Sequence, residues 1–191
     1  MKSERTFTEV LRDLPEGRVI TLGDLLAATG SRTHGVALLL LSLPEALPLP
    51  LPSAAMILGV PLIMISAHLA LFGEAGRLPK RIRDQVLPPW FLNALRGRVA
   101  PLLGRAERLS HPRWLELARR ERILGVVCLY LSVLLLLPFP FFNVPPALCL
   151  VLLAWGMVQR DGMAVAAGLV GAVAMTTALA GLVGWARLAL D

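Results

Sequence analysis

The chain has 191 residues, of which 56% are hydrophobic and 17% are charged, with a formal net charge of +6. This apolar content exceeds what a water-soluble domain of this length needs for one core. The basic balance lacks the motifs and interleaved aromatic residues of nucleic-acid readers, so the composition favours a membrane protein and argues against a nucleic-acid partner.

The charges gather in residues 1–34 and 74–122, which leaves two long stretches nearly free of them. Residues 74–122 contain twelve Lys and Arg against five Asp and Glu. By the positive-inside rule, this basic amphipathic segment is expected to be a cytoplasmic loop. The predicted location is therefore a membrane that the chain crosses more than once, with membrane lipids as partners.

Residues 1–34 are expected to form amphipathic helices. Thr21 has the character of an N-cap, with Asp24 three residues later, so a helix is predicted to start there. Two interpretations are open for these helices. They lie along the cytoplasmic membrane surface, or they pack onto the basic segment without touching lipid.

Residues 35–73 are predicted to form a first hydrophobic hairpin. Its apolar run at 35–47 reaches only about 20 Å as a helix, short of a hydrocarbon core of roughly 30 Å. Pro48 and Pro50 then impose an extended turn, after which the apolar stretch 54–72 returns.

At an offset of 90 residues the pattern repeats, which predicts a second hairpin at residues 123–161. Eight of nineteen positions from 35 to 53 have an identical partner, and composition alone does not explain coincident Gly, Ser and Pro. The pairs are Gly35 and Gly125, Val36 and Val126, Leu39 and Leu129, Leu41 and Leu131, Ser42 and Ser132, Leu47 and Leu137, Pro48 and Pro138, and Pro50 and Pro140.

Residues 162–191 are expected to add one C-terminal transmembrane helix, because 163–186 is uncharged and long enough to span. Small residues at every fourth position form a ridge that permits close helix packing. Packing within the chain and a homodimer seam are both open. The ridge runs through Ala164, Gly168, Ala172, Thr176, Ala180 and Gly184.

These segments together predict an all-α integral membrane protein with an internal repeat of two Pro-x-Pro helical hairpins. Whether the hairpins span or re-enter the membrane is open. Parallel and inverted arrangements of the two copies are also both open.

Five polar residues are candidates for substrate or ion binding. Glu45 interrupts an apolar run, where an ionisable group is costly and usually functional, unless the helix ends at Leu43 and leaves it in a wet loop. Ser53 and Asn143 follow equivalent turns and are suited to capping the returning helices, or to forming an anion-attracting site. Arg160 and Asp161 are suited to pairing with each other or with Glu45, or to marking a simple boundary.

No metal-ligand spacing, nucleophile elbow or phosphate loop is present, and the three histidines are isolated in sequence. We therefore expect no enzymatic activity, no metal and no cofactor.

The chain resembles the ExoD family. The resemblance lies in the turn at residues 138–145, the boundary at 159–162, and the segments 48–50 and 59–61, and it extends from about Phe7 to Arg187. It implies a bacterial inner-membrane protein associated with exopolysaccharide production and, in some bacteria, with tolerance of alkaline conditions. It supplies no functional residue.

Three hypotheses of function follow. The first is a transporter or accessory protein for a polysaccharide precursor or its polyprenyl-linked carrier, because repeated broken helices are typical of transporter sites. The second is a cation or proton transporter that affects polysaccharide indirectly, using Glu45 and Asp161. The third is a non-transporting scaffold that holds synthesis enzymes through its basic segment.

Overall fold

The computed structural model describes residues 20–29, 33–46, 54–74, 76, 78–95, 97, 101, 104–105, 114–136 and 143–190. The segment before residue 20 and both proline turns lie outside the described residues. The turns include the candidates Pro48, Pro50, Ser53, Pro138 and Pro140.

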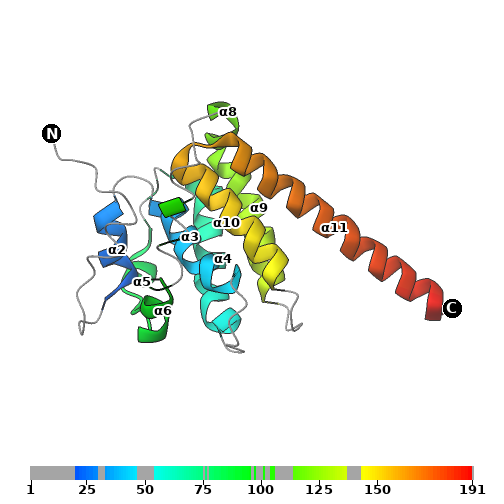
Figure 1. Ribbon diagram of the computed structural model, residues 1–191, viewed down its shortest axis with the longest axis horizontal. Coiled ribbons are helices and arrows are strands. Elements are labelled where there is room, and N and C mark those ends of the chain that lie inside the picture. Colours follow the sequence, from blue (N-terminus) through cyan, green and yellow to red (C-terminus); the bar gives the residue numbers. More distant parts are fainter. Residues whose placement is uncertain are drawn as a thin grey trace.

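Four helices form an antiparallel bundle (Figure 1). They are α3 (Thr33–Ala46), α4 (Ala54–Phe72), α9 (Glu121–Leu135) and α10 (Val144–Gln159). The most extensive packing within the bundle joins α4 to α9 and α3 to α10, so each predicted hairpin packs mainly against the other.

Close contacts at two glycines set the direction of these helices. A Cβ on Gly35 would lie 3.1 Å from Val158 Cγ2, so the start of α3 meets the end of α10. A Cβ on Gly125 would overlap the backbone nitrogen of Ala70 and lie 2.7 Å from its Cα, so the start of α9 meets the end of α4. These starts and ends form one end of the bundle, here called the charged end. The opposite end, where α3 and α9 finish and α4 and α10 begin, is called the turn end.

Helix α3 is the core of the bundle. Its eleven residues from His34 to Pro44 are all buried, which explains why it is apolar around its whole circumference. It continues through Glu45 to Ala46 with Pro44 inside it. The interpretation that this helix ends at Leu43 is therefore wrong, and Glu45 belongs to its last turn.

Helix α2 (Leu22–Thr29) packs on α3 and on α5 (Lys80–Arg83). Its predicted capping is confirmed, because Asp24 N donates to Thr21 Oγ1 at 3.2 Å while Thr21 N donates to Asp24 Oδ2 at 2.9 Å. Leu22 N also donates to the Gln85 carbonyl at 2.9 Å. Of the two interpretations of this region, α2 thus follows the one in which it packs onto the basic segment.

The basic segment also contains α6 (Pro89–Ala94) and α8 (Leu115–Ala118). The last helix, α11 (Gly162–Leu190), turns back from the charged end and packs its first half on α10. Its second half leaves the bundle toward the C-terminus, as Figure 1 shows. Side chains there are largely exposed, including Leu182, Trp185 and Leu188.

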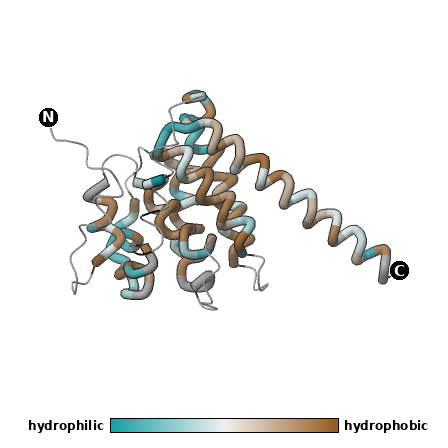
Figure 2. Tube along the Cα trace, in the orientation of Figure 1, coloured by the Kyte–Doolittle hydropathy of each residue, from teal (hydrophilic) through white to brown (hydrophobic). Residues whose placement is uncertain are grey.

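The outer faces of α4, α9 and α10 are apolar (Figure 2). Among the described side chains of these three helices, every exposed one is apolar or is Tyr130, apart from Arg122 in the first turn of α9. A helix that faces water carries a polar outer face, so these faces suit lipid or a protein partner. They include Val60, Met64, Leu71, Phe72, Ile123, Val126, Tyr130, Val133, Leu148 and Leu152.

Among the described helices, one is long and apolar enough to cross a membrane, over Gly162–Leu188. Helices α3, α9 and α10, with 14, 15 and 16 residues, are shorter. They reach only about 21–24 Å, less than a typical hydrocarbon core. Membrane association is thus supported, while a multi-pass topology stays a prediction.

Candidate functional site

Two histidines and a glutamate meet at the charged end of the bundle. His34 Nε2 lies 2.8 Å from His68 Nδ1, and His34 Nδ1 lies 3.3 Å from Glu74 Oε2. His34 is fully buried, while 13% of the Glu74 side chain is exposed. The three residues come from the start of α3, the last turns of α4 and the segment after α4, so the first hairpin itself assembles the cluster.

Glu74 also caps α3. Its carboxylate accepts the backbone N–H of His34 at 3.0 Å and that of Gly35 at 2.6 Å. Two of the N–H groups that a helix start leaves without partners are satisfied in this way, by a negative charge at the positive end of the helix dipole. Because α3 is buried, water cannot take the place of this carboxylate.

The hydrogen bonds of the cluster determine which ring nitrogens of the two histidines carry protons. The Glu74 carboxylate favours a proton on His34 Nδ1, which leaves Nε2 of neutral His34 as an acceptor. His68 Nδ1–H then donates to that nitrogen, and His68 Nε2 keeps its lone pair. Glu74, His34 and His68 thus form one continuous hydrogen-bonded chain that ends at His68 Nε2.

A second carboxylate ties this cluster to the other hairpin. The backbone N–H of Glu74 donates to Glu121 Oε2 at 2.8 Å, and Glu121 begins α9. Gly73, with φ of +68°, ends α4 in the left-handed region. A Cβ there would lie 3.0 Å from Glu121 Oε2, so both the conformation and the space favour glycine.

At the turn end, Glu45 and Asn143 carry the only described side-chain atoms that are buried without a hydrogen-bond partner, Glu45 Oε1 and Asn143 Oδ1. Asn143 holds the N-cap position of α10, but its side chain makes no capping hydrogen bond, so the capping interpretation is wrong for this residue. Unsatisfied buried acceptors are rare and call for a donor or a cation. The turn end of the bundle therefore holds a second group of buried polar side chains, besides the cluster at the charged end.

Arg160 and Asp161 lie at the charged end, between α10 and α11. Arg160 ends α10 in the left-handed conformation, with φ of +54°. Asp161 is buried, and its Oδ1 accepts the N–H of Met163 at 3.0 Å, which caps α11. Glu45 lies at the opposite end of the bundle, so the structure does not bring it to these two residues.

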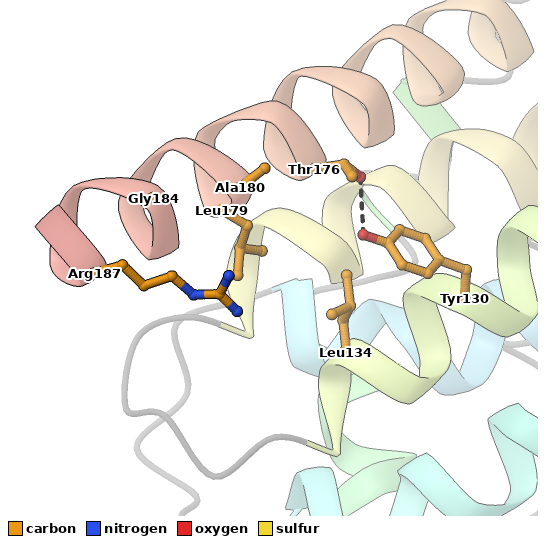
Figure 3. Close-up of a pocket in the computed structure, with 7 residues that line it drawn as sticks. All are labelled: Tyr130, Leu134, Thr176, Leu179, Ala180, Gly184 and Arg187. Carbon is orange, nitrogen blue, oxygen red and sulfur yellow. Dashed lines mark hydrogen bonds between the residues drawn. The ribbon is translucent and has the colours of Figure 1, made fainter.

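The small residues of α11 divide into two sets. Gly168 packs against Leu153, and Ala172 is buried, so the first half of the ridge serves packing within the chain. Thr176, Ala180 and Gly184 instead line an open groove between α9 and α11, of about 430 Å³ (Figure 3). The remaining lining residues are Tyr130, Leu134, Leu179 and Arg187.

The sequence analysis missed the His34, His68 and Glu74 cluster because 34 and 40 residues separate its members. A signal was present, since His34 and Glu74 border apolar runs and His68 interrupts one. Within the described part of the chain, no three His, Cys, Asp or Glu side chains are placed to hold a metal ion.

Comparison with known proteins agrees with the resemblance seen in the sequence. A family model described as "Exopolysaccharide synthesis, ExoD" matches residues 5–181. Protein ExoD of Rhizobium meliloti (strain 1021) is 31% identical over 196 residues, which cover 98% of this chain and 81% of that protein. An uncharacterized protein of Synechocystis sp., slr1875, is 25% identical over 158 residues, covering 81% of this chain and 74% of the relative. No solved structure matches the chain.

Proposed function

Because the chain belongs to the ExoD family of exopolysaccharide synthesis, we propose that it is an inner-membrane protein that transports or helps to handle a polysaccharide precursor or its lipid carrier. The proposal assigns it no catalytic step and no cofactor. The family description gives involvement in exopolysaccharide synthesis, and the geometry of this chain supports the rest of the proposal.

The observation that carries the proposal is the apolar outer surface of α4, α9 and α10. A lipid environment makes such exposed apolar faces energetically favourable, and apolar patches of this extent are rare on soluble monomers. Charged residues such as Arg122, Arg160 and Glu74 lie at one end, where a cytoplasmic interface would place them.

The contacts also support a duplication of the hairpin. Gly35 and Gly125, which correspond at the offset of 90, occupy equivalent positions, each where a helix start meets the end of a helix from the other hairpin. In both copies the first helix ends and the second helix begins at the turn end, which favours two copies of the same orientation over inverted copies. Such a bundle presents both hairpins to one side of the membrane.

Reconstitution tests the transport proposal directly. Proteoliposomes containing the protein are expected to move a fluorescent polyprenyl-phosphate carrier between leaflets faster than empty liposomes, as measured by quenching of the outer leaflet. Liposomes with an equal mass of an unrelated helical membrane protein control for leakage. Equal rates in the two preparations would count against transport and would favour the scaffold hypothesis.

A second candidate, proton or cation transport, is favoured by ionisable groups at both ends of the bundle. His68, His34 and Glu74 form a hydrogen-bonded chain at the charged end, and Glu45 lies at the turn end with an unpartnered oxygen. Intramembrane ionisable groups of this kind commonly mark proton pathways.

If this second function holds, Glu45→Gln will abolish proton uptake into vesicles that contain a pH-sensitive dye, because the amide cannot carry the proton. Glu116→Gln, a charge removal on an exposed side chain of α8, is the matched control. Proton uptake by Glu45→Gln equal to that of the parent would eliminate this candidate.

A further inference from the structure

The groove between α9 and α11 combines apolar walls with one cation at its outer end. Leu134, Leu179, Ala180 and Gly184 supply the walls. Figure 3 shows the Arg187 guanidinium turned back toward Leu179 and the groove. None of the described residues forms an ion pair with Arg187. Its charge is therefore available to an anionic ligand.

The inner end of the groove has no unpaired polar group. Thr176 Oγ1 donates to the Ala172 carbonyl at 2.7 Å, so the Tyr130 hydroxyl donates to Thr176 Oγ1 at 2.9 Å. Figure 3 shows this bond between Tyr130 and Thr176, which joins α9 to α11. A ligand that fits here has an anionic group at one end and a hydrocarbon chain at the other.

The length of the groove matches one leaflet of a bilayer. Eleven residues of α11 separate Thr176 from Arg187, which is about 16 Å along a helix. Half of a hydrocarbon core of roughly 30 Å is about 15 Å. A phospholipid acyl chain therefore extends from the Arg187 level to the Tyr130 and Thr176 pair, whereas a polyprenyl chain is longer than one leaflet.

We propose that this groove binds one phospholipid with a net negative headgroup. Its phosphate pairs with Arg187, and one acyl chain lies between α9 and α11. This inference rests on the membrane insertion proposed above. A second copy of the chain fits less well, because a symmetric partner would bring its own Arg187 to the same depth, and like charges would meet.

Native mass spectrometry of the detergent-solubilised protein, mixed with phosphatidylglycerol or phosphatidylcholine of equal chain length, tests the charge. The parent is expected to retain phosphatidylglycerol with a preference of about fivefold, as one interfacial cation supplies roughly 1 kcal/mol. Arg187→Gln is expected to abolish the preference. Arg122→Gln removes an exposed charge at the other end of α9 and should leave it unchanged. Equal loss in both variants would overturn the assignment.

Two glycines of α11 test the location. A Cβ on Gly184 or on Gly181 meets no atom within 4 Å, so a larger side chain at either position leaves the fold intact. Only Gly184 lines the groove. Gly184→Leu is therefore expected to displace the bound phospholipid and Gly181→Leu to retain it. Retention by both would overturn the proposal.

Other occupants give distinct results. Displacement of phosphatidylglycerol by polyprenyl phosphate, or a dimer that Gly184→Leu dissociates, would each overturn the phospholipid assignment. Extraction of membranes with alkaline carbonate separates failure of this inference from failure of the proposed function. A chain that stays in the membrane but shows no lipid preference contradicts only the groove assignment, whereas a chain released by carbonate contradicts membrane insertion itself.

Discussion

Gly125→Ala is expected to destabilise the bundle by about 3 kcal/mol, in the upper range for overpacking of a core. The added methyl would overlap the backbone nitrogen of Ala70 and lie 2.7 Å from its Cα. Backbone atoms cannot rotate away as a side chain can, so α4 and α9 must separate. The gain of about 1 kcal/mol from removing a helical glycine is included in this net loss. Thermal unfolding followed by circular dichroism in detergent measures the effect.

Alanine substitutions at two other glycines, Gly35 and Gly181, serve as comparisons for Gly125→Ala. At Gly35 the nearest atoms are Val158 Cγ2 at 3.1 Å and Glu74 Oε1 at 3.2 Å, both in side chains that can shift, so Gly35→Ala should cost less. At Gly181 the space is open, and Gly181→Ala should be neutral or slightly stabilising. If Gly125→Ala unfolds at the same temperature as Gly181→Ala, the close contact of α4 with α9 does not exist in solution.

Local signals in the sequence predicted much of the helical framework. Thr21 and Asp24 predicted the start of α2, because the capping pattern that they form involves only neighbouring residues. The uncharged stretch after Gly162 predicted α11, because its length alone distinguishes it from the shorter apolar segments of the chain. Glu45 was harder to place because Pro44 suggests that a helix ends, whereas a proline near the last turn of α3 is tolerated.

The proximity of His34 and His68 could have been predicted from the sequence. The two residues are equidistant from position 51, next to the predicted proline turn, so a symmetric helical hairpin brings them to the same level. In the structure His34 Nε2 lies 2.8 Å from His68 Nδ1. The roles of Glu74 and Glu121 could not have been predicted from the sequence, because they depend on how the segment after α4 contacts a helix 47 residues further along the chain.

The groove between α9 and α11 and the missing cap hydrogen bond of Asn143 both depend on packing between helices, which no local sequence pattern encodes. A ridge of small residues on α11 shows that another helix can approach, but not where the approach ends. In the structure it ends near Thr176, beyond which α11 diverges from the bundle. No ion-pair partner for Arg187 lies among the described residues. Asn143 has the residue type of a cap, yet the start of α10 does not offer its side chain an N–H.

Glu74→Ala is expected to cost about 3 kcal/mol and to open the start of α3. The substitution leaves the backbone N–H groups of His34 and Gly35 and the Nδ1–H of His34 without an acceptor. Each unsatisfied buried group costs about 1–3 kcal/mol, reduced where the structure relaxes. Glu74→Gln should recover only part of the loss, because its NH₂ group would face N–H donors where the carboxylate presents oxygen.

Hydrogen exchange at the amides of His34 and Gly35 distinguishes this local opening from general destabilisation, since it should rise at these two positions more than in the middle of α3. Glu116→Ala, at an exposed position of α8, is the control and should stay within about 0.5 kcal/mol of the parent. Unchanged exchange in Glu74→Ala would mean that another group caps α3.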